Sequence, residues 1–427
     1  MINNEENEEI FESKDQLINE EYKIWKYNSK YLYNKLFVTS LEWPSLTVSY
    51  LGDNKGSDSN LLFGTFAPVN EYNYIMTGRV RFPEVETIGE DKVNNIYTYE
   101  YNKDTLNRYR ELENKFEITQ KISFQGEVNR AKPMPQDQNI IASKCINGEV
   151  QIYELNKHLE ENELENYLAQ PELILNGHNK EGFGLDWNLG KKGYIISGSE
   201  DNKICVWDIN KGKVDESKGG LNPLFKPPDT HQAPVNDVCF HRLQFNIFAS
   251  CSDDRQIRLW DMRMEAPMFK IEGHVQEINS VDFNHFNEYL LLSGSNDKSV
   301  ALWDMRNIKD KLYQFKNHKN DVLQVKWSPH ILSLFASSSR DRRINVWDLS
   351  KISSVPQQRT SKTSKNSFVS PPELIFTHSG HTSSVNFFDW NPEKELEIAS
   401  VSEDNILQVW KMNEKIYYEE EDEMEIE

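Results

Sequence analysis

Histidine, aspartate and serine recur together in this chain, and a single set of them could form the proton relay of a hydrolase. In five segments a His lies 29 positions before a Trp, and an Asp lies six positions before the same Trp. The triplets are His178, Asp201 and Trp207; His231, Asp254 and Trp260; His274, Asp297 and Trp303; His318, Asp341 and Trp347; and His381, Asp404 and Trp410. An enzyme needs one such site rather than five, so we interpret these residues as structural parts of a repeat.

The repeat that carries the triplets predicts the fold. Each copy ends in an apolar strand closed by Trp and a polar residue, as in ICVWD (204–208), and the Asp falls where a tight turn should join two strands. This pattern is typical of a WD repeat, in which each copy forms one four-stranded blade, the His bonds the Asp and the Trp packs the blade. A degenerate sixth copy has Phe124, Asn147 and Tyr153 in the His, Asp and Trp registers.

A seventh unit must come from residues 41–120, where LTVSYL (46–51), NLLFGTF (60–66), YNYIMTG (72–78) and NNIYTYEY (94–101) have the composition of strands. We therefore predict an all-β fold, a seven-bladed WD-repeat β-propeller over residues 39–412. Closing the ring removes exposed sheet edges. We expect residues 46–51 to close it as the outer strand of the last blade, beside the strand that ends at Trp410.

Segments outside the blades complete the predicted organisation. Residues 13–37 have apolar side chains at helical spacing, which predicts a helix packed on the side of the propeller, and one edge of it could form half of a groove. We assign residues 1–38 to this N-terminal unit and residues 413–427 to the start of a short C-terminal helix and an acidic tail. Three insertions are expected at 80–118, at 155–171 as a short amphipathic helix, and at 351–372 as a Ser/Thr/Lys-rich loop.

Composition narrows the class of partner. The formal net charge of −20 and the pI near 5.1 favour basic proteins as ligands and disfavour direct nucleic-acid binding. The four cysteines form no C-x-x-C pair and have no His cluster beside them, so we expect reduced thiols in an intracellular protein without a metal or other cofactor. The polar, acidic N-terminus does not resemble a secretory or mitochondrial leader, and no apolar run is long enough to span a membrane.

One register of the repeat collects acidic residues. Just before the innermost strand of each blade, four of six copies begin with an acid: Glu127, Glu181, Glu277 and Asp321. Because the repeat places equivalent positions around one axis, these carboxylates should encircle one mouth of the central channel. Such a ring favours a basic peptide. The alternative interpretation is ordinary solvated charge at strand ends.

Several longer motifs resemble one particular family. EEYKIWKYNSKYLYNKL followed by LEWPSLTVSYL, together with GEVNRAKPMPQ, GHNKEGFGLDWN, DKSVALWDMRN, QVKWSPH, DRRINVWDLSKI, PPELIFTHSGHT and SVSEDNILQVW, is similar to the retinoblastoma-binding, histone-binding WD-repeat family. That family supplies the small subunit of chromatin assembly factor 1. The resemblance spans about residues 17–418 and goes beyond the generic repeat signature.

The resemblance implies two histone sites. The first is the top face, which holds basic N-terminal peptides such as the histone H3 tail. Its residues, carried over by position, are Glu42, Trp43, Glu127, Asn129, Arg130, Glu181, Phe183, Glu277, Asn279, Asp321, Glu403 and Asn405. Phe183 stands where the family usually has Tyr, Asn236 replaces a usual acid, and Leu323 replaces an aromatic residue, so the choice of peptide could differ.

The second implied site is a groove between the N-terminal helix and a Pro-Pro loop, which holds the first helix of histone H4. Its residues here are Tyr31, Leu32, Pro371, Pro372, Leu374, Ile375 and Phe376. The family's loop before the prolines is acidic, whereas residues 351–372 contain Lys351, Arg359, Lys362 and Lys365 and no acid. The ionic half of H4 recognition is therefore altered, unless Glu373, Glu20 or the acidic tail substitutes for it.

The function that the resemblance implies is a non-catalytic histone-binding scaffold in the nucleus. Its partners would be histones H3 and H4 and the subunits of chromatin assembly, deacetylase, remodelling and Polycomb-type complexes, with the chain monomeric inside such hetero-complexes. The alternative is a ribosome-biogenesis WD-repeat protein of the glutamate-rich type, but the helix joined directly to LEWPSL favours the histone-binding family. An enzyme is disfavoured because the sequence shows no lone acid pair, metal cluster or phosphate-binding loop.

Overall fold

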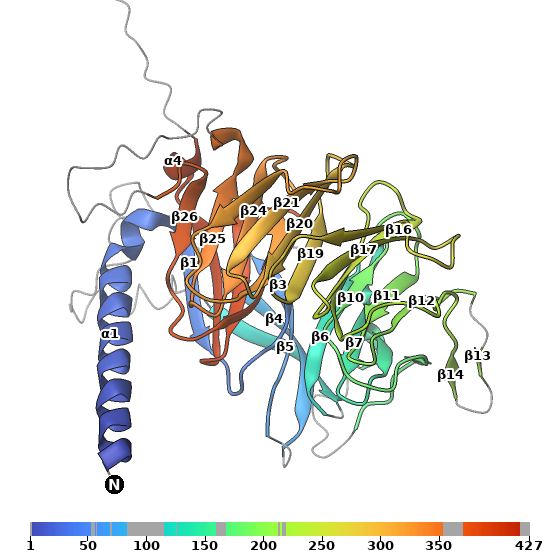
Figure 1. Cartoon of the computed structure of the whole chain (residues 1–427). Coiled ribbons are helices and arrows are strands. Elements are labelled where there is room, and N and C mark those ends of the chain that lie inside the picture. Colours follow the sequence, from blue (N-terminus) through green and yellow to red (C-terminus); the bar gives the residue numbers. More distant parts are fainter. Residues whose placement is uncertain are drawn as a thin grey trace, which may run out of the picture.

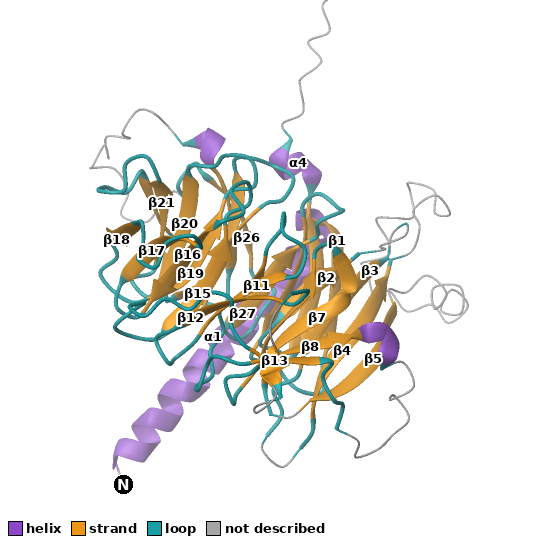
Figure 2. Ribbon diagram, turned by 90° about the vertical axis from the view of Figure 1, so that its right-hand side faces the viewer, coloured by secondary structure: helices purple, strands orange, loops and turns teal. Residues whose placement is uncertain are grey.

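The computed structural model describes residues 2–52, 56, 58–68, 71–82, 115–124, 126–158, 168–211, 214–215, 219–352 and 370–418, with side chains from Asp15 onward. Within these ranges the strands form seven sheets, and each innermost strand contacts the innermost strands of the two neighbouring sheets. The contact between the first sheet and the last closes the ring (Figure 1, Figure 2). The prediction of a seven-bladed β-propeller is confirmed.

The first three blades contain the less regular copies. Blade 1 comprises β2 (Val48–Leu51), β3 (Ser59–Gly64), β4 (Asn73–Arg81) and β5 (Lys115–Phe124). Blade 2 comprises β6 (Val128–Met134), β7 (Asp137–Cys145), β8 (Val150–Glu154) and β9 (Leu173–Leu175), extended by β14 (Gly220–Leu221) and β13 (Val214–Asp215). Blade 3 has three strands, β10 (Leu185–Trp187), β11 (Tyr194–Gly198) and β12 (Ile204–Asp208), and an isolated bridge from Phe225 to Val206 in place of a fourth.

The remaining four blades are regular. Blade 4 comprises β15 (Val235–Phe240), β16 (Ile247–Ser252), β17 (Gln256–Asp261) and β18 (Phe269–Glu272). Blade 5 comprises β19 (Ile278–Phe283), β20 (Leu290–Ser295), β21 (Ser299–Asp304) and β22 (Tyr313–Lys316). Blade 6 comprises β23 (Val322–Trp327), β24 (Leu334–Ser339), β25 (Ile344–Asp348) and β26 (Leu374–His378). Blade 7 comprises β27 (Val385–Trp390), β28 (Glu397–Ser402), β29 (Ile406–Met412) and β1 (Tyr33–Ser40).

Blade 7 closes the ring with a different strand from the one we predicted. The outer strand beside β29 is β1, in which Phe37 lies opposite Val409, whereas residues 46–51 contribute the innermost strand of blade 1. Burial explains the exchange: every residue of β2 is buried, as an innermost strand requires, while β1 alternates between buried and exposed side chains. The predicted helix over 13–37 was wrong at its end, since α1 spans Ile2–Leu32 and Tyr33 begins β1.

The insertions are only partly described. Residues 80–81 and 115–118 belong to β4 and β5, and the predicted strand at 94–101 lies outside the described residues. The helix predicted over 155–171 is wrong at both described ends, because Leu155–Lys157 form one 3-10 turn and 168–171 are not helical. A short helix, α4 (Glu414–Tyr417), follows the last blade as predicted, and the acidic tail from 419 onward lies outside the described residues. No described helix has the length and apolar character needed to cross a membrane.

Apolar side chains fill the spaces between neighbouring blades. The five repeat tryptophans Trp207, Trp260, Trp303, Trp347 and Trp410 are at most 1 % exposed. Helix α1 lies outside this core at the periphery, beside β1 and β26, and its N-terminal end projects beyond the sheets (Figure 1, Figure 2). The fold therefore offers three surfaces for ligands: the two mouths of the channel and the side that carries α1.

Candidate functional site

The repeated His and Asp residues form a buried structural lock in each regular blade. In blade 5 His274 Nδ1 lies 2.8 Å from Asp297, and its Nε2 lies 2.7 Å from the Ser293 hydroxyl. The same hydroxyl accepts a hydrogen bond from Trp303 Nε1 at 2.8 Å. Blades 4 and 6 repeat the arrangement through His231 and His318. Because the imidazole is enclosed by the blade, these groups are not placed to reach a substrate.

Two of the five copies depart from this lock. In blade 3 His178 contacts Asp201 at 3.1 Å, but its Nε2 is buried without a partner among the described residues. In blade 7 His381 Nδ1 lies 2.6 Å from Ser402 instead of bonding Asp404, so the predicted His–Asp contact is wrong in this copy. There Asp404 accepts from the backbone N–H of Thr382 at 2.9 Å and from its hydroxyl at 2.6 Å.

Burial fixes the charge states of these groups. It lowers the pKa of His178 and that of His381 to about 4, so both rings are neutral at physiological pH. Burial opposes ionisation of Asp297, but the hydrogen bond from His274 outweighs it and holds the Asp297 pKa well below its usual range. The lock is thus a neutral imidazole against an ionised carboxylate.

One mouth of the channel is formed by two loops from every regular blade, and we call it the top face. Each loop that precedes an innermost strand accepts a backbone hydrogen bond from the loop between the next two strands. The pairs are Glu200 N to Glu181 O at 2.9 Å, Asp253 N to Pro234 O at 3.1 Å, Asn296 N to Glu277 O at 3.0 Å, Arg340 N to Asp321 O at 3.0 Å, and Glu403 N to Ser384 O at 3.1 Å. Phe66 N to Pro44 O at 2.9 Å is the equivalent pair in blade 1. The acids of the predicted ring therefore share one face.

The acidic character is strongest over blades 2 and 3. The pKa of Glu127 is raised, first by partial burial and then by repulsion from Glu181. Glu181 Oε2 accepts from Asn129 Nδ2 at 3.0 Å, and Glu200 stands beside it on the neighbouring loop. Within the described residues none of these three carboxylates has an ion-pair partner, so a basic ligand would find them uncompensated.

A second acidic group lies at the seam between blades 7 and 1. Glu403 is exposed and accepts from the Ser383 hydroxyl at 3.3 Å. Asn405 Nδ2 donates to the Glu42 carbonyl at 3.4 Å, which places Glu42 and the half-buried Trp43 next to it. Together with blades 2 and 3 this seam gives the top face an acidic arc rather than a complete ring.

Other predicted top-face residues have structural partners. Asn129, Asn236 and Asn279 each donate to a backbone carbonyl of the next blade, at 3.4, 2.9 and 2.7 Å respectively, and so join neighbouring blades. Glu277 accepts from Asn296 at 3.4 Å. Asp321 is paired with Arg340 at 3.4 Å, so this acid is neutralised.

Phe183 and Arg130 meet at the edge of the channel. The Phe183 ring is 38 % exposed, and its carbonyl accepts from Arg130 Nε at 3.1 Å. The Arg130 guanidinium lies 3.8 Å from the centroid of the Phe387 ring, inside the channel rather than on the rim. Burial lowers its pKa to about 10, against the attraction of Asp237 and Asp389. We therefore move Arg130 from the rim of the predicted site to its floor.

Sequence reasoning missed a second acidic register. Glu200, Asp253 and Glu403 precede the lock aspartate in their blades, and Arg340 occupies the same place in blade 6. The signal was available, because each of these residues lies seven positions before the repeat Trp. Only the backbone pairing of the loops shows that both registers face the same mouth.

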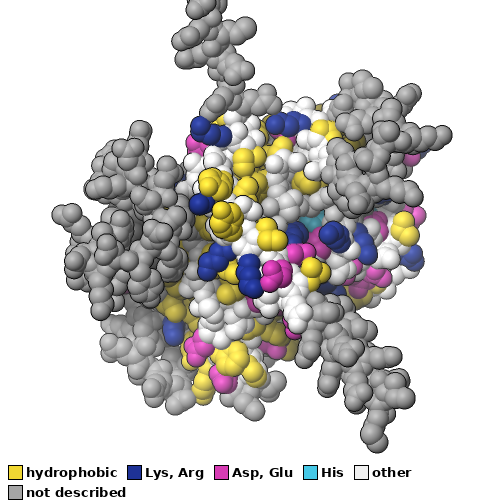
Figure 3. All heavy atoms as spheres, turned by 90° about the vertical axis from the view of Figure 1, so that its left-hand side faces the viewer, with side chains coloured by type: hydrophobic (Ala, Val, Ile, Leu, Met, Phe, Trp, Pro, Cys, Tyr) yellow, Lys and Arg dark blue, Asp and Glu magenta, His cyan; other side chains and the backbone are white. Residues whose placement is uncertain are grey.

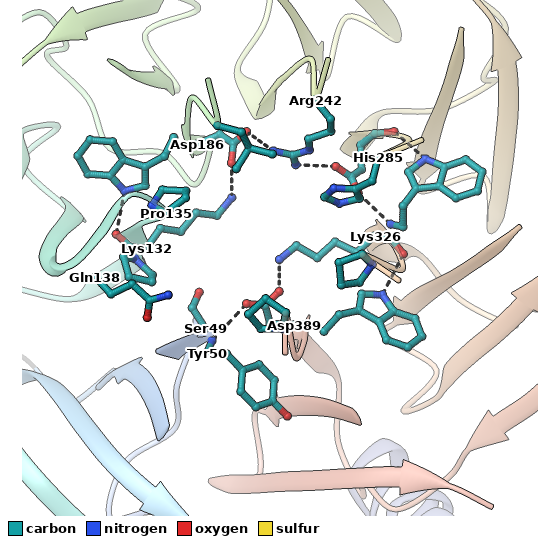
Figure 4. Close-up of a pocket in the computed structure, with 18 residues that line it drawn as sticks. Ser49, Tyr50, Lys132, Pro135, Gln138, Asp186, Arg242, His285, Lys326 and Asp389 are labelled. Atoms are coloured by element: carbon teal, nitrogen blue, oxygen red, sulfur yellow. Dashed lines mark hydrogen bonds and ion pairs between the residues drawn. The ribbon is translucent and has the colours of Figure 1, made fainter. Parts of the chain in front are cut away.

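The opposite mouth opens into a cavity of about 270 Å³ whose charges are internally balanced (Figure 4). Lys132 lies 3.1 Å from Asp186, and Arg242 bridges Asp186 and Asp282 at 3.2 and 2.8 Å. Lys326 pairs with Asp389 in the same ring. Because three cations meet three carboxylates there, this mouth offers no net attraction for a basic peptide, in contrast to the top face.

Helix α1 is anchored to blades 6 and 7 by one aromatic cluster and one ion pair. Trp25 Nε1 donates to the Tyr33 hydroxyl at 2.9 Å, and that hydroxyl lies 2.7 Å from His378 Nδ1. Glu21 pairs with Arg342 at 3.1 Å and Arg343 at 2.8 Å. These contacts hold one face of the helix against the propeller.

A second face of α1 remains uncovered. Ile24, Tyr27 and Tyr31 are 62 %, 72 % and 63 % exposed, and Leu17 extends this stripe toward the N-terminus. Their spacing puts them on one side of the helix. Figure 3 shows the face that carries α1, where hydrophobic side chains gather among Lys and Arg side chains. Ile24 and Tyr27 were missed from sequence, because the helical pattern alone does not distinguish the docked face from the free one.

The predicted groove residues lie at the C-terminal end of this stripe. Leu32 and Ile375 are half-buried and pack on the cluster that contains Trp25 and Phe376. Phe376 is only 6 % exposed, so it supports the groove from below rather than lining it. Pro371, Pro372 and Leu374 lead into β26, where Pro372 is exposed and the other two are half-buried.

The charges beside the groove are not those of an acidic wall. Glu373, one of the acids expected to substitute, is 5 % exposed and accepts from the Tyr313 hydroxyl at 2.9 Å, so it faces the interior. Glu20 is exposed but is paired with Lys23 at 2.9 Å. Lys30 lies over the rings of Tyr27 and Tyr31. The α1 wall thus combines an apolar stripe with lysines.

Nothing in the described part of the chain gathers three or more potential metal ligands. The four cysteines are buried as free thiols, as expected for reduced side chains. The fold, the two mouths and the groove therefore describe surfaces for binding polypeptides.

Comparison with known protein families agrees with this architecture. The model of the WD domain, G-beta repeat, matches residues 170–208, 224–261, 265–304, 309–348 and 372–411, which makes the chain a WD-repeat β-propeller protein. A second model, that of histone-binding protein RBBP4 and its counterpart in the CAF1 complex, matches residues 20–84, from the docked half of α1 into blade 1. The chain belongs to this WD-repeat family of RBBP4-type histone-binding proteins. Neither matching model is that of a catalytic family.

Proposed function

We propose that this protein is a nuclear histone-binding scaffold without catalytic activity of its own, serving chromatin assembly, deacetylase, remodelling and Polycomb-type complexes. The observation that carries the proposal is the contrast between the two mouths of the channel. Glu127, Glu181 and Glu200 are uncompensated on the top face, whereas the opposite mouth balances three cations against three carboxylates. A basic histone H3 N-terminal peptide is the ligand that this top face favours.

The groove beside α1 is proposed as the site for the first helix of histone H4. An amphipathic helix docks through its apolar face onto an apolar stripe. Ile24, Tyr27 and Tyr31 supply that stripe on a helix that the Trp25 cluster and Glu21 hold in place. The lysines beside the stripe and the basic loop 351–372 make the apolar contact, rather than ion pairs, the main source of affinity here.

Two matched double variants test the proposal. Glu127→Gln with Glu181→Gln removes two top-face charges, and Ile24→Ser with Tyr27→Ser removes two apolar groups of the groove. Each variant serves as the control of the other, and all four side chains are at least partly exposed, so folding should be retained. We expect the first to weaken an H3 N-terminal peptide about 10- to 100-fold, a loss of roughly 1–3 kcal/mol for two partly exposed charge pairs.

The groove variant should weaken an H4 first-helix peptide by a similar factor and leave the H3 peptide unchanged. Isothermal titration calorimetry of both peptides against the wild type and both variants measures this. Equal affinities of the H3 peptide for the wild type and the charge variant would remove the top face from the account. Equal affinities of the H4 peptide for the wild type and the groove variant would remove the groove.

A further inference from the structure

The seams between blades follow a size rule that one seam reverses. Gly64, Gly198 and Gly294 have no room for a Cβ, which would come within 2.4, 2.5 and 2.7 Å of a valine of the next blade. Those valines are Val128, Val235 and Val322. At the seam between blades 2 and 3 the small and large residues are exchanged. Lys144 occupies the glycine register and Gly182 the valine register, where a Cβ would lie 3.0 Å from Lys144 Nζ.

The exchange places an amine where the other seams have methyl groups. Lys144 is completely buried, and its Nζ donates to Ser197 Oγ at 2.7 Å and to the Gly198 carbonyl. Ser197 is the hydroxyl that would complete the lock of blade 3. Lys144 takes it instead, which explains why His178 Nε2 has no partner and why Trp207 Nε1 donates to the Asn176 carbonyl.

The same amine supports the acidic loop of the top face from below. Gly182 lies directly over it, between Glu181 and Phe183. The turn that Lys144 holds at Gly198 is bonded to this loop twice over, since Ser199 Oγ donates to the Glu181 carbonyl at 2.7 Å and Gly198 N donates to the Gly184 carbonyl at 3.1 Å. The position of the Glu181 loop therefore depends on Lys144.

The surroundings of Lys144 suit a neutral amine. Two hydrogen bonds satisfy both N–H groups of a neutral amine, whereas an ammonium has a third N–H for which the described residues offer no partner. Burial accordingly lowers the pKa of Lys144 to about 7. The ionisable groups that face it are Arg130 on β6, Cys145 on β7, Cys205 on β12, Asp201 in the β11–β12 turn and His178 before β10.

Only two of these neighbours are charged near neutrality. Burial lowers the His178 pKa to about 4 and raises the Cys205 pKa to about 12, and it raises that of Cys145 as well, so all three are uncharged. Arg130 keeps its positive charge and Asp201 its negative charge at this pH. Their opposite charges leave Lys144 as the group beneath the loop that titrates near neutrality.

We propose that Lys144 is a proton-linked positioning residue for the basic ligand of the top face, an inference that rests on the proposed function. A ligand cation over Glu127 and Glu181 adds positive charge above the buried amine and so disfavours the ammonium form. Binding therefore expels the Lys144 proton into solvent, and the affinity for a basic peptide rises with pH through neutrality. A purely structural Lys144 would hold the loop without this proton exchange.

Calorimetry of an N-terminally acetylated H3 peptide tests the proton exchange, because acetylation removes the peptide's own amine from the titration. The binding enthalpy is measured at pH 7 in phosphate and in Tris, whose different ionisation enthalpies reveal released protons. We expect release by the wild type and none by Lys144→Met, and a wild-type affinity that rises roughly threefold from pH 6 to pH 8. The matched control Lys203→Met removes an exposed lysine from the same turn and should keep the release.

A comparison without ligand separates this inference from the proposed function. In the unfolded chain Lys144 has its usual pKa of 10.5, so the unfolded state binds more protons between pH 7 and 10.5, and native stability should rise with pH over this window. The urea midpoint of the wild type should therefore gain on that of Lys144→Met between pH 7.5 and 9.5. A constant difference, or equal proton release by both proteins, overturns the role of Lys144. A wild type that binds no peptide overturns the proposed function, and the urea comparison still decides whether Lys144 titrates.

Discussion

The clearest stability prediction compares the complete lock of blade 5 with the incomplete lock of blade 3. His274→Ala removes an imidazole that contacts Asp297 at 2.8 Å and Ser293 at 2.7 Å. His178→Ala removes an imidazole that contacts Asp201 at 3.1 Å and has no partner on its other nitrogen. Both side chains are buried, and the cavity that each substitution leaves is of similar size. The difference between the two variants therefore reports the hydrogen bonds.

The magnitude follows from these contacts. Asp297 keeps the backbone N–H groups of Val275 at 3.2 Å and Ser299 at 3.1 Å after the substitution, and Ser293 keeps Trp303, so neither partner is left wholly unsatisfied. We expect His274→Ala to lower the free energy of unfolding by about 2–3 kcal/mol, from one hydrogen bond to a charged group and one to a neutral group. His178→Ala should cost about 1 kcal/mol less, because only the longer contact to Asp201 is lost.

Urea unfolding followed by tryptophan fluorescence at pH 7.5 measures both variants. This pH lies far above the His178 pKa of about 4, so protonation does not contribute. A loss for His178→Ala equal to or larger than that for His274→Ala would refute the assignment of the incomplete lock. A hydrolase activity that disappears with His274 alone would refute the structural interpretation of all five copies.

Three further predictions concern the groove, the helix anchor and acid stability. Changing Arg359, Lys362 and Lys365 to Glu should strengthen binding of an H4 first-helix peptide, more at low than at high salt, because the loop they belong to is joined to β26; affinity measured at two ionic strengths checks this, and weaker or salt-independent binding by the variant contradicts it. Glu21→Gln should loosen α1 by roughly 1 kcal/mol, since the pair with Arg342 and Arg343 is partly exposed; limited proteolysis of the helix should then be faster, and an unchanged rate opposes this role. Because burial lowers the pKa of His178 and His381 to about 4, the unfolded state binds more protons between pH 6.5 and 4, so stability should fall over this window by roughly 2–3 kcal/mol per histidine; thermal unfolding from pH 8 to 4 measures this, and a melting temperature constant down to pH 4 contradicts it.

Sequence reasoning predicted the features that repeat. The triplet of His274, Asp297 and Trp303 recurs in fixed register, and the number of blades followed from it. The closing strand was misassigned because residues 46–51 and 33–40 both carry strand-forming residues. Only the continuous burial of Val48–Leu51 shows that they form an innermost strand.

The candidate site was predictable as far as register decides position. The acids before the innermost strands lie on one face as predicted, but register says nothing of which partner each acid meets. Asp321 is neutralised by Arg340 and Glu373 is turned toward Tyr313, and both results depend on side chains from other segments. The exchange of Lys144 with Gly182 was missed for the same reason, since it becomes visible only when two blades are placed side by side.

Hydrogen–deuterium exchange with each histone peptide tests the central claim, two separate binding surfaces, most directly. With the H3 N-terminal peptide bound, we expect protection at 126–130, 181–184, 198–200 and 403–405, all on the top face. With the H4 first-helix peptide bound, we expect protection at 24–32 and 371–378 and none on the top face. Protection by both peptides of the same segments, or of the opposite mouth around Lys132 and Asp186, would contradict the account.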